Sequence, residues 1–192
     1  MNKWIMAGTA AAFTGAAAFA RSEYERTHLD IVHYDIKTDK LGLEWNGFKA
    51  VFLSDLHDNS FGMKNEELLA AIEKEQPDIV LIGGDMLVVK EWAAPNFDML
   101  ANLYKKLVKR YPVYYAFGNH EQRMKEEPLT YPGWWQSYWK VLKDSDMHVL
   151  VNKSEEIIKN GTAMRISGIT LPRECYRKGR IPSLSAGYID KK

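Results

Sequence analysis

Three short polar clusters in the sequence carry side chains of the kinds that bind metal ions, and each cluster follows an apolar run. The clusters are Asp55-Leu56-His57, Gly84-Asp85 and Gly118-Asn119-His120-Glu121. Asp55 and His57 stand two residues apart, so in an extended chain their side chains point to the same side and can hold one ion. Mixed carboxylate, imidazole and amide groups indicate a site for Mn, Fe or Zn rather than a thiolate-type site. The sequence therefore indicates a metal centre built from three separate segments.

The other residues of these clusters suggest further roles at such a centre. The carboxylate of Asp85 can bridge two cations, and Asn119 offers a neutral amide oxygen. His120 can remain outside the metal ligands and act on the substrate, while Glu121 fixes the orientation of its ring. The alternative is that Asp55 and Asp85 only cap helices that follow the strands, which leaves the histidines and the amide unexplained.

Alternating strand and helix patterns would bring the three clusters together. Apolar runs predict buried strands over 48–53, 79–82 and 113–117, and apolar residues at helical spacing predict helices over 65–76 and 96–109. This βαβαβ order implies a parallel sheet with right-handed crossovers, and ligand sites in such sheets lie beyond the carboxyl ends of the strands. Each polar cluster follows the end of one predicted strand. The fold class is therefore α/β, with the candidate site at one edge of the sheet.

Patterns outside this unit predict three more elements. Residues His28–Lys37 alternate between polar and apolar and predict an edge strand, and residues 163–168 predict another strand. Residues 134–144 predict a helix in which Trp135, Trp139 and Leu142 share one face. That face suits core packing, although exposed aromatic residues beside a membrane could also bind a lipid-like substrate.

The first twenty residues differ from the rest in composition. Trp4–Ala20 is uncharged and rich in alanine, and Ala18-Phe19-Ala20 fits the small residues that precede a signal cleavage site. As a helix this stretch would reach about 25 Å, slightly short of the roughly 30 Å hydrocarbon core. We expect a signal peptide or membrane anchor over residues 1–20 and a domain that faces outside the cytoplasm. The alternative is an alanine-rich first helix packed on the domain.

Composition excludes several classes of protein. Hydrophobic residues make up 46% of the 192 residues and charged residues 27%, values of a folded globular chain rather than a disordered or multi-span membrane protein. Lys and Arg number 26 against 25 Asp and Glu, so no broad cationic field favours nucleic acid as a partner. Cys175 is the single cysteine and cannot form an internal disulfide. His28, His33 and His148 lack a partner pattern and are interpreted as strand or surface residues.

The three clusters resemble the calcineurin-like metallophosphoesterase superfamily, whose pattern runs D-x-H, G-D, G-N-H-[DE], then a separate His and a final G-H-x-H. The stretch from the N-terminus through Asp55-Leu56-His57 looks most like a membrane-associated branch that includes lipid-precursor pyrophosphatase-like enzymes. The resemblance covers roughly Phe48 to the end. It implies a calcineurin-like β-sandwich flanked by helices in four layers (αββα), of which this chain would hold the N-terminal part. The implied domains are an N-terminal edge strand and connection over 21–47 and a metallophosphoesterase domain over 48–192.

The resemblance also implies roles for the site residues. Asp55, His57 and Asp85 would hold a first divalent metal ion, and Asp85 and Asn119 would hold a second. His120 would stabilise or protonate the leaving oxygen, and a hydroxide that bridges the two metals would attack phosphorus in line. The implied function is hydrolysis of a phosphodiester or pyrophosphate. The N-terminal segment adds a slight preference for a lipid-linked substrate.

The family pattern is incomplete in this chain. After His120 the only histidine is His148, which lies in Asp146-Met147-His148-Val149 rather than in a G-H-x-H block, so two C-terminal blocks have no counterpart. We therefore expect residues 48–192 to be a C-terminally truncated domain. A second hypothesis follows, in which the chain is a non-catalytic truncated half-domain that binds metal weakly or associates with another chain. The oligomeric state stays open.

Overall fold

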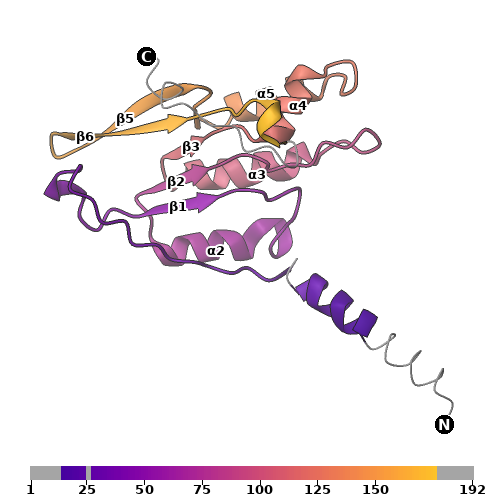
Figure 1. Ribbon diagram of the computed structural model, residues 1–192, viewed down its shortest axis with the longest axis horizontal. Coiled ribbons are helices and arrows are strands. Elements are labelled where there is room, and N and C mark those ends of the chain that lie inside the picture. The colour runs from indigo at the N-terminus through magenta and orange to yellow at the C-terminus, as the bar shows by residue number, and fades with distance from the viewer. Residues whose placement is uncertain (1–13, 25–26, 177–192) are drawn as a thin grey trace, which may run out of the picture.

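A four-stranded parallel sheet forms the centre of the protein (Figure 1). In the computed structural model, which describes residues 14–24 and 27–176, strands β1 to β4 lie side by side in sequence order. The strands are β1 Ala50–Leu53, β2 Ile79–Ile82, β3 Val113–Tyr115 and β4 His148–Val149. The helices that connect them are α2 Glu66–Glu75, α3 Phe97–Val108, α4 Asn119–Glu126 and α5 Trp134–Lys143. The described residues also contain an antiparallel hairpin and three short 3-10 helices. The hairpin strands are β5 Lys153–Lys159 and β6 Thr162–Gly168, and the 3-10 helices are η1 Leu43–Trp45, η2 Met63–Asn65 and η3 Arg173–Tyr176.

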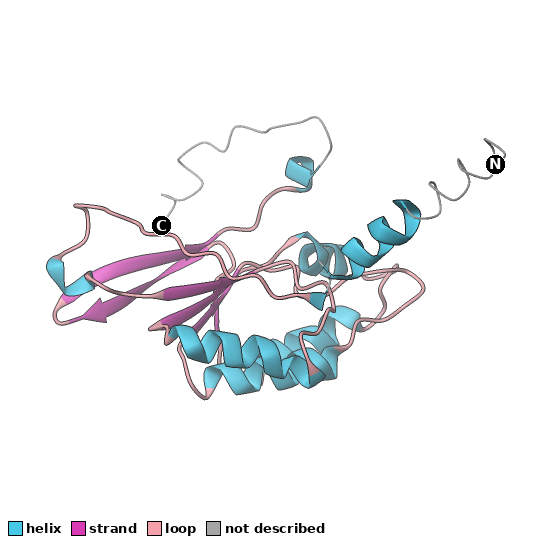
Figure 2. Ribbon diagram, turned by 90° about the horizontal axis from the view of Figure 1, so that it is seen from below, coloured by secondary structure: helices cyan, strands magenta, loops and turns pink. Residues whose placement is uncertain are grey.

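The helices and the hairpin cover opposite faces of the parallel sheet (Figure 2). Strands in sequential order with right-handed crossovers place every connecting helix on the same face. On that face Ile82 and Tyr115 are buried in the main core with residues of α2, α3 and α5. Neighbouring residues point to the other face, where Tyr114 packs with Ile157 of β5. The described residues therefore form three layers, and the fourth, helical layer expected from the resemblance is not among them.

Most of the predicted elements are present with small shifts at their ends. β2 has the predicted bounds, β1 begins at Ala50, and β3 ends at Tyr115 rather than at residue 117. The Asn96 side chain caps α3 because its oxygen accepts a hydrogen bond from the Met99 amide at 3.0 Å. In α5, Leu142 is buried and both Trp135 and Trp139 pack against the main core. The core interpretation of that helix face is confirmed.

The beginning of α2 differs from the prediction. Asn65, the first residue of the predicted helix, lies just before α2 in the left-handed conformation, with φ of 63°, and its side chain makes no capping hydrogen bond. Its oxygen instead accepts from the Phe61 amide at 3.0 Å, which closes the preceding turn. Buried Asn65 therefore shapes the loop that carries the first polar cluster.

The predicted edge strand at His28–Lys37 is wrong. Residues 28–38 form no regular element, and Tyr34 and Ile36 are 83% and 87% exposed. Because no layer among the described residues covers them, these apolar side chains gain no burial from strand formation. His33 Nε2 lies 2.8 Å from Glu75 Oε2, so the segment is tied to α2 rather than to the sheet edge.

The N-terminal segment is helical where it is described. Residues 14–24 form a helix, and Phe19 within it is 72% exposed, so this part does not pack on the domain. Within the described residues, no helix has both the length and the apolar character needed to cross a membrane. The first thirteen residues of the predicted leader lie outside the described residues.

Candidate metal centre

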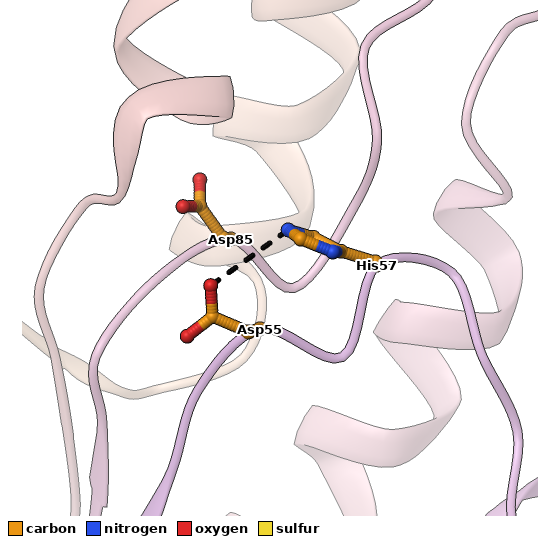
Figure 3. A group of neighbouring side chains, drawn as sticks. All are labelled: Asp55, His57 and Asp85. Carbon is orange, nitrogen blue, oxygen red and sulfur yellow. Dashed lines mark ion pairs between the residues drawn. The ribbon is translucent and has the colours of Figure 1, made fainter. Parts of the chain in front are cut away.

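Three side chains of the predicted site converge beyond the carboxyl ends of β1 and β2 (Figure 3). One ligand atom each from Asp55, His57 and Asp85 lie within 4.8 Å of one another. His57 Nε2 is 3.8 Å from Asp55 Oδ1, and Ser54 Oγ donates to Asp55 Oδ2 at 2.5 Å. Asp85 is 8% exposed, whereas the other two are open to solvent. The trio combines two carboxylates and an imidazole at a solvent-accessible position.

Backbone hydrogen bonds continue past the strand ends and hold the two loops together. The Asp55 amide donates to the Gly84 carbonyl at 3.1 Å, and the His57 amide donates to the Asp85 carbonyl at 3.1 Å. The Asp58 amide continues the series with the Met86 carbonyl at 3.2 Å. The loop after β1 is therefore fixed against the loop after β2, and the ligand positions are set by backbone pairing.

All three converging residues have left-handed backbone conformation, with φ of 56° at Asp55, 52° at His57 and 51° at Asp85. The prediction that the chain is extended at Asp55 and His57, with both side chains on the same side for that reason, is wrong. Leu56 is nevertheless buried and its two neighbours converge. Asp and His are among the residues that tolerate this region best, and such strain is concentrated at functional sites.

Two glycines allow the second and third loops to touch. A Cβ on Gly84, which has φ of 88°, would lie 1.9 Å from the Gly118 nitrogen. A Cβ on Gly118 would lie 2.4 Å from Asp85 Oδ1. Both positions therefore exclude a side chain, because the backbone of one loop contacts the backbone and carboxylate of the other.

The N-terminus of α4 brings the third cluster to Asp85. The His120 amide donates to Asp85 Oδ1 at 2.8 Å. In the amide orientation that satisfies its neighbours, the Asn119 nitrogen donates to Asp85 Oδ2 at 2.9 Å. Asn119 therefore lies beside Asp85, and its oxygen accepts from the His120 amide at 3.2 Å. Its role as a ligand of a second ion stays a prediction.

The ring of His120 faces the same site. It lies 5.2 Å from the His57 ring, measured between centroids, in an edge-to-face arrangement. The Val89 amide donates to His120 Nδ1 at 3.0 Å, so in the neutral ring the proton is on Nε2. Partial burial lowers the pKa of His120, and the nearby charge of Arg123 adds to this effect while Asp85 opposes it.

Glu121 does not orient the His120 ring, and that part of the prediction is wrong. Its carboxylate is fully buried and accepts four hydrogen bonds from elsewhere. The amides of Asp85 and Gly118 donate to Oε2, each at 3.0 Å, and the Met86 amide and Tyr115 hydroxyl donate to Oε1 at 3.2 and 2.7 Å. Glu121 therefore fastens the second and third loops to each other.

A chain of three buried tyrosines supports Glu121 from the core. The Tyr115 hydroxyl is 2.5 Å from that of Tyr138, which is 2.9 Å from that of Tyr104. Burial raises the pKa of all three hydroxyls, so they remain protonated. The chain links β3, α5 and α3 to the loops. Sequence reasoning missed it because these residues matched only the general pattern of core positions.

The donor set fits a divalent ion. The three ligand atoms already lie within 4.8 Å of one another. Small side-chain rotations are therefore enough to bring each of them to the distance of about 2.0–2.2 Å that oxygen and nitrogen ligands keep from a metal ion. His148, which follows the three clusters in the sequence, lies in β4 and is not part of the converging group. Its Nδ1 is 2.6 Å from Glu155 Oε2 and its ring stacks on Tyr114.

The pattern that defines the calcineurin-like phosphoesterases matches residues 48–185, which contain all three clusters. The chain belongs to this family. The chain is also similar to Phosphodiesterase YaeI of Escherichia coli K12, at 28% identity over 57% of this chain and 38% of the relative. It is 31% identical to the uncharacterized metallophosphoesterase YkoQ of Bacillus subtilis 168, over 61% of this chain and 41% of the relative. The matched segments thus span about two fifths of the curated relatives' length.

Family membership agrees with the fold and with the location of the site. The parallel sheet flanked by helices is the α/β arrangement expected for this family, and the polar clusters occupy its carboxyl edge. The protein therefore carries a metallophosphoesterase domain with a group of side chains suited to divalent metal.

Proposed function

We propose that this protein is a metal-dependent phosphoesterase that hydrolyses a phosphodiester or a pyrophosphate. The observation that carries the proposal is the convergence of Asp55, His57 and Asp85, within a chain that belongs to the calcineurin-like phosphoesterases. The first ion would be held by these three residues, and a second by Asp85 and Asn119. Mn, Fe and Zn all suit such ligands. The similarity to YaeI, which is named a phosphodiesterase, supports a diester substrate.

Each site residue then has a defined task. Two divalent ions would supply positive charge against the phosphate oxygens and lower the pKa of the attacking water. Asp85 is held in place for this role because its own amide donates to Glu121 Oε2 and its Oδ1 accepts from the His120 amide of α4. His120 presents Nε2–H, since Nδ1 accepts from Val89, and donates a hydrogen bond to the leaving oxygen. The lowered pKa of His120 keeps the ring in this neutral form at neutral pH.

The proposal is tested with the full-length protein, bis-p-nitrophenyl phosphate and added Mn²⁺. We expect metal-dependent hydrolysis that Asp85→Asn abolishes, together with weaker Mn²⁺ binding by calorimetry. Asp98→Asn, at an exposed acid in the first turn of α3, is the matched control and keeps both properties. Full activity in Asp85→Asn, or equal activity after chelation, would sink the proposal.

A second candidate function is a non-catalytic half-domain that binds metal weakly or associates with another chain. It is favoured by the ligand inventory, because the described residues contain one group of three metal-binding side chains, and Asp85 and Asn119 alone remain for a second ion. Calorimetry on the 192-residue chain separates the two candidates. Two tightly bound Mn²⁺ ions per chain would rule the half-domain out.

We also propose that residues 1–20 export the protein or tether it to a membrane, with the domain outside the cytoplasm and a lipid-linked substrate within reach. The alanine-rich composition and the exposed helix over 14–24 support this role. Cell fractionation of the full-length protein and of a variant without residues 1–20 provides the test. Both forms in the cytoplasmic fraction would contradict the proposal.

A further inference from the structure

A pocket of about 420 Å³ opens beside the metal centre, between α4 and η3. Its lining residues are Asn119, Gln122, Arg123, Arg173, Glu174 and Tyr176. Asn119 lies against Asp85 and also lines this pocket, so the two sites share a wall. A molecule bound at the metal centre can therefore extend into the pocket.

Arg123 is the cation of this pocket that is available to a ligand. It follows Asn119 by four residues, so both side chains lie on the same side of α4, about 6 Å apart along the helix axis. The Arg123 side chain is partly buried, and it forms no ion pair with any residue in the described ranges. Arg123 also follows His120 by three residues, so the two residues are neighbours on the surface of α4.

The opposite wall of the pocket is fixed by an ion pair. Arg173 of η3 binds Glu127, the residue that ends α4, so the charge of Arg173 is already compensated. This contact holds η3 against α4. Tyr176 also lines the pocket, and burial raises the pKa of its hydroxyl. The Tyr176 hydroxyl therefore stays protonated and can donate a hydrogen bond.

We propose that Arg123 and Tyr176 bind a second phosphate group that is joined directly to the scissile phosphate, which makes the substrate a pyrophosphate diester. This inference rests on the proposed function. A partly buried guanidinium that forms no ion pair among the described residues is costly, and its planar donors match a phosphate in bidentate geometry. The leaving group of a simple diester, a neutral alcohol, would leave that charge unpaired. The distance of one helical turn keeps Arg123 away from the metal ligands but within reach of a neighbouring phosphate.

Hydrolysis of such a substrate is balanced at every atom. The oxygen of water forms a bond to the scissile phosphorus, and the bond between that phosphorus and the bridging oxygen breaks. The bridging oxygen leaves with the electron pair as part of the second phosphate, next to Arg123. One proton of water goes to the departing bridging oxygen or to solvent, the other stays on the new phosphate oxygen or passes to solvent, and no oxidant or reductant is needed.

The inference is tested on the full-length protein by calorimetry, with methylenediphosphonate and methylphosphonate titrated as Mn²⁺ complexes into Mn²⁺-saturated protein. These probes differ by one phosphonate group and neither is cleaved. In Arg123→Gln the preference for the diphosphonate should fall by about 10-fold to 100-fold, the range for loss of a charged hydrogen bond. Arg123→Lys should recover part of it. Arg165→Gln on β6, where the arginine is exposed and pairs with Glu156, is the matched control and keeps the preference.

Turnover separates this inference from the proposed function. Bis-p-nitrophenyl phosphate has one phosphate, and UDP-glucose is a soluble pyrophosphate diester. In Arg123→Gln the ratio of kcat/KM for UDP-glucose to that for bis-p-nitrophenyl phosphate should fall by a similar factor. An unchanged diphosphonate preference, or equal losses for both substrates, would overturn the role of the pocket. If neither substrate were hydrolysed but the diphosphonate preference still depended on Arg123, the phosphoesterase assignment would be refuted and the anion-binding role of the pocket would be supported.

Discussion

Substitution of Glu121 by glutamine should disrupt the metal centre although Glu121 binds no metal. The carboxylate is fully buried and each of its oxygens accepts two hydrogen bonds, from three backbone amides and the Tyr115 hydroxyl. Burial raises the pKa of Glu121, and the hydrogen bonds from Tyr115 and the Asp85 amide oppose that rise. Because all four neighbours donate, the ionised form satisfies them. Glutamine replaces one oxygen with an amino group that faces two donors.

The size of the effect follows from these contacts. If the new nitrogen faces the Asp85 and Gly118 amides, both lose their acceptor. If it faces Met86 and Tyr115, the Tyr115 hydroxyl can accept from it and donate to Tyr138, and the Met86 amide alone loses its acceptor. Each loss costs about 1–3 kcal/mol, so the total is about 1–6 kcal/mol, a large part of the 5–15 kcal/mol typical of a domain. For a chain of this length, 1 kcal/mol shifts Tm by about 2–4 °C, so the expected loss is about 2–24 °C. Because Glu121 joins the Asp85 loop to α4, Mn²⁺ affinity should also fall by about 10-fold to 100-fold.

Thermal unfolding and Mn²⁺ calorimetry measure the two effects. Glu126→Gln on the same helix is the matched control, since the exposed Glu126 accepts only from Gln122 at 2.8 Å and glutamine can still accept there. Its cost should stay within about 0.5 kcal/mol. Glutamine also resembles a protonated carboxyl group. If Glu121→Gln matched the control in Tm, the carboxyl would be protonated in the folded protein and the argument from four donors would be refuted.

Two further predictions concern the contact between loops and the buried hydroxyls. Gly84→Ala should prevent folding or metal binding, because its Cβ would meet the Gly118 nitrogen. Gly161 has φ of 83° and open space around it, so Gly161→Ala should cost only about 1–2 kcal/mol, the usual penalty for a left-handed residue. Equal losses of stability in thermal unfolding would contradict the steric argument. The chain of buried tyrosines, Tyr104, Tyr115 and Tyr138, should limit stability at high pH. Their folded pKa values are raised, so the stability tied to them is full below the unfolded pKa of about 10 and is lost as pH rises above it. Tyrosinate absorbance should show these groups ionising only together with unfolding, and ionisation before unfolding would exclude a buried chain.

The sequence was sufficient to predict the sheet and the convergence of the site because both depend on local patterns. Ile79–Ile82 is apolar throughout, as a strand covered on both faces requires, and its bounds were predicted without error. Once parallel strands are assigned, residues after their ends must share one edge of the sheet. Asp55, His57 and Asp85 follow from this rule alone.

The features that could not be predicted depend on contacts between segments distant in sequence. His28–Lys37 has a strand pattern, but no described layer covers its apolar side chains. The partner of Glu121 was expected to be its neighbour His120, whereas its actual partners include amides 35 and 36 residues away. The left-handed conformation of Asp55 likewise follows from loop pairing with Gly84, which no local pattern encodes.

The second and third clusters act as one mechanical unit. Gly118 leaves room for the Asp85 carboxylate, the next turn of α4 donates an amide to that carboxylate, and Glu121 returns to accept the Asp85 amide. One segment therefore fixes the aspartate of the other at both its backbone and its side chain. The tyrosine chain ties this unit to three elements of the core, so the precision of the ligand positions derives from the packed interior rather than from the loops themselves. In the function we propose, this rigidity would keep the Asp85 carboxylate in position to hold metal.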